Sequence, residues 1–260
     1  MRRSYIIPNI FTSANLLCGL LAIIKVFDSD VVTAGWLILA ASIFDGLDGQ
    51  IARLTKSESR FGLNFDSLAD MVSFGIAPAL LIYSVISLRH IHLATIEAVL
   101  FGGCCALRLA RYNVQATTTV NRYFMGIPSP AAAGVIASAF LVMQNSNSVL
   151  MEKLFSFLPL ISAFLMISII KYPKINPISI LKEKHLKIPA FIITILAVIF
   201  SIIIFEQLAL FILFSTYLAY GTIIFILNAV TSHPIEESII DFDEDEDDEF
   251  IEPEETLDNK

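Results

Sequence analysis

Long apolar stretches separated by short polar connections run through most of the chain. A helix needs about 20 mostly apolar residues to cross the hydrocarbon core of a bilayer, and eight stretches come close to that length. The pattern predicts an all-α integral membrane protein with about eight spans. The expected spans cover residues 9–27, 31–53, 63–87, 93–111, 129–146, 154–170, 188–205 and 207–229. A hydrophobic fraction of 56% over 260 residues agrees with this reading and excludes an ordinary soluble domain.

The basic residues gather on one side of the expected membrane topology. Thirteen lie at the N-terminus or in alternate connections, and only Lys25, Arg89 and Lys153 lie on the other side. Cytoplasmic connections carry the excess of Lys and Arg. The bias therefore places both termini, and the connection around residues 53–60, on the cytoplasmic side of the cell membrane. No nucleic-acid partner is expected.

The acidic residues divide into a terminal tail and a small internal group. Fourteen of the 25 lie between Glu236 and Asp258, and without residues 236–260 the chain carries 16 basic and 11 acidic residues, a net charge of +5. The tail has too little apolar surface to fold and its charges repel one another. We expect residues 231–260 to form a disordered acidic tail.

Four aspartates fall within 26 residues, at the expected cytoplasmic ends of the second and third spans. Asp45 and Asp48 are spaced i, i+3, and Asp66 and Asp70 are spaced i, i+4, so each pair shares a helix face. Carboxylates at membrane depth are costly unless something pairs with them, and four together repel one another. With oxygen ligands only and no His or Cys in range, the group predicts a site for Mg²⁺ or Mn²⁺.

Small and basic residues surround these acids. Gly49, Ala52 and Gly62 leave the backbone open to a bulky group. Arg53 and Arg60 offer positive charge to a phosphate. Together with bound metal ions, these residues predict a pyrophosphate site.

The whole pattern, D-x2-D-G-x2-A-R-x8-G-x3-D-x3-D, resembles the signature of the CDP-alcohol phosphotransferases. It is carried without departure by Asp45, Asp48, Gly49, Ala52, Arg53, Gly62, Asp66 and Asp70. The resemblance implies a six-helix membrane domain over residues 1–170. A cytoplasmic basic loop (171–187), a two-helix transmembrane extension (188–230) and the acidic tail would follow.

Four further runs resemble the type II phosphatidylserine synthases within that family: IPNIFTSANLLCG, DSLADMVSFGIAP, LRLARYN and GIPSPAAAG. The resemblance implies CDP-diacylglycerol and L-serine as substrates, CMP as a product and a homodimer in the lipid bilayer. It also implies that the four aspartates bind two divalent cations, Mg²⁺ or Mn²⁺. Asp70 would in addition be the general base.

The same resemblance implies which residues touch the nucleotide. Contacts with the CDP moiety and its metal ions are expected from Pro8, Asn9, Asp48, Gly49, Ala52, Arg53, Ser59, Gly62 and Asp66. Arg108 and Arg111, spaced i, i+3, can face one pocket and hold the serine carboxylate or the lipid phosphate. Weaker candidates for the serine pocket are Asn113, Ser129 and Lys182.

Three alternatives stay open at this point. The same chemistry could use another acceptor, such as glycerol 3-phosphate or an inositol phosphate. A membrane cation transporter could use the aspartates as an ion path, although transporters place such ligands near the midplane on broken helices. A scaffold that has lost activity is the third, and the intact set of positions argues against it.

Overall fold

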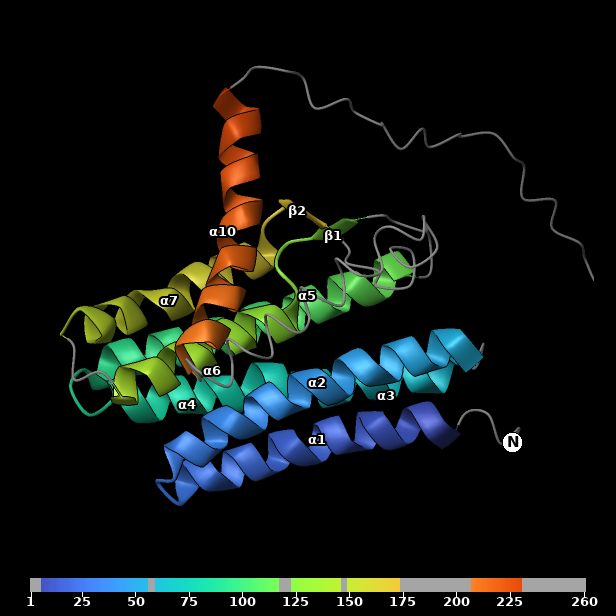
Figure 1. Cartoon of the computed structure of the whole chain (residues 1–260), viewed down its shortest axis with the longest axis horizontal. Coiled ribbons are helices and arrows are strands. Elements are labelled where there is room, and N and C mark those ends of the chain that lie inside the picture. Colours follow the sequence, from blue (N-terminus) through green and yellow to red (C-terminus); the bar gives the residue numbers. More distant parts are fainter. Residues whose placement is uncertain (1–5, 56–58, 117–122, 146–148, 174–206, 231–260) are drawn as a thin grey trace, which may run out of the picture.

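The computed structural model describes residues 6–55, 59–116, 123–145, 149–173 and 207–230, and within these ranges the chain is almost entirely helical (Figure 1). The helices are α1 (Ile6–Phe27), α2 (Val31–Thr55), α3 (Arg60–Asp70), η2 (Met71–Ile76), α4 (Ala77–Ile86), α5 (Ile91–Ala116), α6 (Ser129–Asn145), α7 (Val149–Ile167) and α10 (Gln207–Val230). Two short strands, β1 (Tyr123–Met125) and β2 (Lys171–Pro173), pair antiparallel. The sequence did not predict this pair.

Four helical stretches are long and apolar enough to cross a membrane. They are Pro8–Phe27, Val31–Ala52, Phe61–Ile86 and Ile91–Val114. They agree with the first four predicted spans, so the chain is a multi-pass membrane protein. The later described helices contain shorter apolar stretches, Ser129–Gln144, Phe155–Ile167 and Gln207–Tyr220. The predicted span 188–205 lies outside the described residues.

The first two spans form an antiparallel hairpin closed by a tight turn. Asp30 directly precedes α2, and its carboxylate accepts a hydrogen bond from the backbone N–H of Thr33 at 3.3 Å. Hydrogen bonding to Thr33, with the positive charge of Lys25 nearby, lowers the pKa of Asp30. Lys25 lies 3.6 Å from the carboxylates of both Asp28 and Asp30. These contacts fix the turn at the end of the hairpin remote from the aspartate group.

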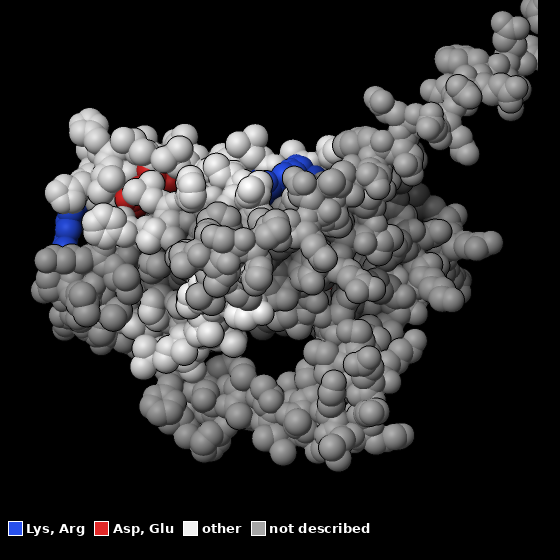
Figure 2. Space-filling view, turned by 90° about the horizontal axis from the view of Figure 1, so that it is seen from above, with Lys and Arg blue, Asp and Glu red and all other residues white. Residues whose placement is uncertain are grey.

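Helix α6 lies at the centre of the bundle and contacts α2, α7 and α10. Its residues from Ala132 to Val142 are all buried, and Phe140 packs edge-on against Phe155 of α7 with ring centroids 6.1 Å apart. The outward surfaces of the other helices carry large apolar side chains such as Leu17, Ile43 and Val99. On the face seen in Figure 2 the described surface is largely uncharged, as expected for a surface in contact with lipid.

The third span is continuous but not uniform. Its first helix, α3, is preceded by Ser59, whose hydroxyl oxygen accepts a hydrogen bond from the backbone N–H of Gly62 at 3.0 Å and so caps the helix. The backbone then widens into the π-helical turn η2 directly after Asp70, before α4 continues the rod. Such π-helical turns occur frequently at functional sites, and this one follows one of the four aspartates.

Candidate active site

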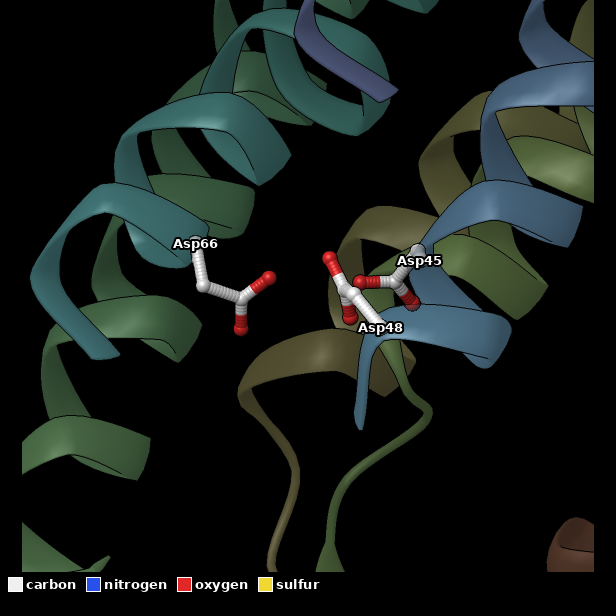
Figure 3. Close-up of side chains that lie close together, drawn as sticks. All are labelled: Asp45, Asp48 and Asp66. Atoms are coloured by element: carbon white, nitrogen blue, oxygen red, sulfur yellow. The ribbon is translucent and has the colours of Figure 1, made fainter. Parts of the chain in front are cut away.

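Three of the four aspartates converge between α2 and α3. Figure 3 shows Asp45 and Asp48 extending from α2 and Asp66 from α3, with their carboxyl groups directed into the space between the helices. One carboxylate oxygen from each lies within 4.8 Å of the others. The convergence expected from the i, i+3 and i, i+4 spacings is therefore present in the structure.

The fourth aspartate, Asp70, lies one turn further along α3 and interacts with two of the other three. It is 7% exposed and interacts directly with Asp45 and electrostatically with Asp66 and the Arg108 guanidinium. Its Oδ1 accepts a hydrogen bond from Nδ2 of Asn15 in α1 at 3.1 Å. All four carboxyl groups thus belong to one connected group.

The carboxylates fit a divalent cation. Asp48 Oδ2 and Asp66 Oδ1 are buried and have no hydrogen-bond partner among the described residues. A buried ionised oxygen without a partner is strongly unfavourable, and no lysine or arginine forms an ion pair with these carboxylates within the described ranges. A hard cation bound by the clustered oxygens would remove that cost, and oxygen donors alone suit Mg²⁺ or Mn²⁺.

The helices next to the acids leave room for a ligand. Apart from the neighbouring residues and the backbone of α2 itself, a Cβ atom added at Gly46 or Gly49 would meet no described atom within 4 Å. Across the site, a Cβ at Gly62 would lie 3.1 Å from Ser59 Oγ and 3.5 Å from Asn9 Oδ1. Three candidate nucleotide contacts, Asn9, Ser59 and Gly62, are therefore adjacent, although they come from α1 and from the start of α3.

The remaining nucleotide candidates lie around this region. Pro8 is buried in the first turn of α1 and Ala52 is half-buried near the end of α2. Arg53 belongs to α2, and its side chain lies outside the described part of the chain.

Arg108 is a buried cation that interacts electrostatically with Asp70 and Asp45 of the acidic group. It is 6% exposed, and its Nη1 donates to Ser129 Oγ at 2.8 Å. Its guanidinium carbon lies 5.9 Å from the ring centroid of Tyr112, a cation–π distance. Its Nε is buried without a partner among the described residues. Arg108 therefore has a buried donor group available near Asp70 and Asp45.

Arg111 has a different environment from Arg108, although both lie on α5. Its guanidinium donates to the backbone carbonyls of Ile167, Met125, Met166 and Ser168 at 3.0, 2.8, 3.0 and 3.3 Å. These carbonyls belong to the end of α7, to the residue that follows it, and to Met125, the last residue of β1 before the connection to α6. Gly126 in that connection has φ +76°, and a side chain there would overlap the carbonyls of Leu165 and Met166. Arg111 thus joins two segments of backbone to α5.

The weaker candidates for the serine pocket have different hydrogen-bond partners. Asn113 exchanges hydrogen bonds with Ser67 at 2.9 and 3.0 Å and so joins α5 to α3. Ser129 accepts the bond from Arg108. Lys182 lies outside the described residues.

Sequence reasoning did not single out two residues of α1. Asn15 contacts Asp70, and the Thr12 hydroxyl lies against Asp48. Pro8, Thr12, Asn15 and Gly19 are all buried at helical spacing. A polar face inside an apolar span was the available signal, because membrane helices direct such residues toward the interior of the bundle.

Comparison with known proteins identifies the family. The family description "CDP-alcohol phosphatidyltransferase" matches residues 5–168. The chain is 36% identical over 222 residues to a CDP-diacylglycerol--serine O-phosphatidyltransferase of Helicobacter pylori, covering 84% of this chain and 90% of that protein. It is 39% identical over 174 residues to the enzyme of the same name from Methanocaldococcus jannaschii, covering 67% of this chain and 77% of that protein.

A further relative differs in name but shares the family. An archaetidylserine synthase of Methanothermobacter thermautotrophicus is 37% identical over 173 residues, covering 65% of this chain and 70% of that protein. The family match includes every aspartate of the site and the helices that position them. This chain therefore belongs to the CDP-alcohol phosphatidyltransferase family of membrane enzymes.

Proposed function

We propose that this protein transfers the phosphatidyl group of CDP-diacylglycerol to the hydroxyl of L-serine, giving phosphatidylserine and CMP. The observation that carries the proposal is the group of four connected carboxyl groups at the membrane domain's aspartate signature. The names of the relatives at 36% and 39% identity support serine as the acceptor. Family membership makes the transporter and inactive-scaffold alternatives unnecessary.

The reaction is a single displacement at phosphorus. Asp70 takes the proton of the serine hydroxyl, and the hydroxyl oxygen forms a bond to the phosphorus that carries diacylglycerol. The bond from that phosphorus to the bridging oxygen breaks, and CMP leaves with the electron pair. Asp70 is the proposed base because it is buried and interacts with two other carboxyls of the acidic group and with the Arg108 guanidinium.

The acidic group is the proposed binding site for divalent cations. Asp45, Asp48, Asp66 and Asp70 would hold two divalent cations, Mg²⁺ or Mn²⁺. When bound, these would neutralise charge on the diphosphate and on the leaving group. Without them, four neighbouring carboxylates would repel the anionic substrate. Activity should therefore require an added divalent cation.

The open backbone beside the acids is the proposed nucleotide site. The space beside Gly49 admits a bulky group, and Asn9 and Ser59, which lie next to Gly62, supply polar atoms for the nucleotide. Pro8, Ala52 and Arg53 complete the proposed contacts with CDP. The lipid chains of the substrate would then extend along the apolar outer surface of the helices.

Arg108 is the proposed partner of the serine carboxylate. It is buried, retains an unpartnered Nε–H donor and lies close enough to Asp70 to affect its electrostatics. A guanidinium can bind a carboxylate through two parallel hydrogen bonds. Arg111 is less suited to this role, because its donors are engaged by four backbone carbonyls.

The proposed topology and domain division of the protein are based on the sequence pattern. We propose eight spans, with both termini and the active site on the cytoplasmic side and a homodimer in the membrane. Residues 1–170 would form the catalytic six-helix domain, followed by a basic loop (171–187), two further spans (188–230) and an acidic tail (231–260).

The test uses purified full-length protein in lipid vesicles with CDP-diacylglycerol, Mn²⁺ and radiolabelled serine. We expect label in a lipid that carries a primary amine and a carboxylate, in an amount equal to the CMP released. A diether CDP-lipid serves as a second donor, because one relative is an archaetidylserine synthase. Incorporation of labelled glycerol 3-phosphate or inositol phosphate in place of serine would contradict the proposed acceptor.

A further inference from the structure

Helix α1 reaches the proposed base through a single buried side chain. Asn15 is 0% exposed, and its Nδ2 donates to Oδ1 of Asp70 at 3.1 Å. An ionised carboxylate can only accept hydrogen bonds, so the amide nitrogen must be the end that faces it. The other end of the amide, Asn15 Oδ1, is buried without a partner among the described residues. The contact with Asp70 is therefore the one interaction described for this side chain.

A second bond holds the backbone of the same residue. Ser73, three residues after Asp70 in the π-helical turn, donates its hydroxyl to the carbonyl oxygen of Asn15 at 2.9 Å. One turn further along α1, a side chain at Gly19 would overlap Ser73. Helix α1 and the π-helical turn are thus in direct contact. Asn15 is bound at both its side chain and its backbone to the segment that carries the base.

This arrangement limits how the carboxyl of Asp70 can rotate. The bond from Asn15 to Oδ1 restricts rotation of the carboxyl group and leaves Oδ2 as the oxygen that Asn15 does not engage. A side chain that only filled space would not need an amide, and a buried carbonyl without a partner reduces stability. The amide at this position is therefore explained by its contact with Asp70 rather than by packing.

We propose that Asn15 is a positioning residue, which holds Asp70 through Oδ1 so that Oδ2 faces the hydroxyl of the acceptor. The inference rests on the proposed function, because it assigns Asp70 the role of base. Asn15 is not proposed to touch the nucleotide. Its loss should therefore slow turnover without weakening nucleotide binding.

The first variant is Asn15→Leu, which keeps the size of the side chain and removes the donor. Misplacing a reacting group by about 1 Å costs about 10²-fold in rate, so we expect kcat to fall by about 10²-fold. We expect KM for CDP-diacylglycerol and Kd for CMP, measured with Mn²⁺ by calorimetry, to stay within about threefold, since an interaction used only in turnover appears in kcat. A general loss of structure would weaken CMP binding as well.

A second variant covers the case in which Asn15→Leu does not fold. Asn15→Ala removes the donor without adding bulk or charge, and it should lose as much kcat as Asn15→Leu. Ser73→Ala removes only the backbone bond and should lower kcat less. The double variant Asn15→Leu with Ser73→Ala should lose less than the product of the two separate losses, because residues in one hydrogen-bonded network are not independent.

The matched control is Ser84→Ala. The Ser84 hydroxyl also donates to a backbone carbonyl, that of Leu81 at 2.9 Å, but within its own helix and outside the acidic site. It should leave kcat unchanged.

Three results decide the inference. A kcat within about threefold of wild type in either Asn15 variant would overturn it, because positioning must appear in kcat. A CMP affinity that falls together with kcat would assign Asn15 to nucleotide binding or to folding instead, which also overturns it. Failure of the proposed function is recognised separately, since wild-type protein would then release no CMP in response to serine.

Discussion

Replacing Arg111 with glutamine removes a guanidinium that binds backbone in two separate segments. Three of its four hydrogen bonds, to Ile167, Met125 and Met166, measure 2.8–3.0 Å, and the fourth, to Ser168, measures 3.3 Å. Glutamine is shorter and has one NH₂ group, so it cannot reproduce this pattern. The change therefore tests whether Arg111 stabilises the fold or binds substrate.

The magnitude follows from the three shorter bonds. A typical hydrogen bond contributes about 1 kcal/mol net, so their loss should cost about 3 kcal/mol. For a chain of this size about 1 kcal/mol lowers Tm by about 2–4 °C, so Tm should fall by about 6–12 °C. Lys25→Gln is the control, because it removes only the ion pairs with Asp28 and Asp30 at the surface. Its Tm should fall by no more than about 4 °C, since such pairs contribute about 1 kcal/mol at most.

The assay combines thermal denaturation in detergent with kinetics well below Tm. For Arg111→Gln we expect the lowered Tm together with a KM for serine within about threefold of wild type, since a residue that acts on folding leaves substrate binding intact. The reasoning would be refuted by an unchanged Tm with a KM for serine raised about tenfold or more, the pattern of lost ground-state binding. That result would assign Arg111 to the serine pocket.

The remaining predictions concern the site itself. Asp70→Asn should keep the fold and CMP binding but lose about 10²–10⁴-fold in kcat, the range for a general base; activity equal to wild type would refute the role of base. Removal of divalent cations by a chelator should abolish activity, and added Mn²⁺ or Mg²⁺ should restore it. Asp66→Asn should raise the cation concentration needed for half-maximal rate, and an unchanged cation requirement would contradict the cation site. Gly49→Leu should leave Tm unchanged or slightly higher, since Leu favours helix by about 1 kcal/mol over Gly, and should raise KM for CDP-diacylglycerol. Gly103→Leu, at an equally open position on α5, is the matched control, and an equal rise in KM for both variants would count against a nucleotide site at Gly49.

Much of the architecture could be predicted from residue periodicity alone. The first four spans follow from apolar length, because a bilayer requires continuous helices of that length. The π-helical turn after Asp70 has no equivalent signal in the periodicity, and it lies where α1 packs against the third span at Gly19 and Ser73. The pairing of β1 with β2 joins residues about 48 positions apart and likewise depends on tertiary contacts.

In the candidate site, too, some features follow from local sequence spacing and others depend on contacts between residues far apart in sequence. The convergence of Asp45, Asp48 and Asp66 follows from helical spacing and a short connection. The different environments of Arg108 and Arg111 could not be predicted from helical spacing, because their i, i+3 spacing suggested a shared pocket. Arg111 is engaged because the end of α7, 55 residues away in sequence, reaches it. Asn15 and Asp70 are also 55 residues apart in sequence. Their contact therefore depends on how α1 packs against the third span.

The most direct test of the central claim is CMP release from CDP-diacylglycerol by the purified protein with Mn²⁺ or Mg²⁺. Serine, glycerol 3-phosphate and inositol phosphate are compared as acceptors, with Asp70→Asn as the inactive control. The account predicts release that requires serine and a divalent cation and that is lost in the control. Release that depends on a phosphorylated acceptor would contradict serine as the substrate, and no release with any acceptor would contradict the proposed function as a whole.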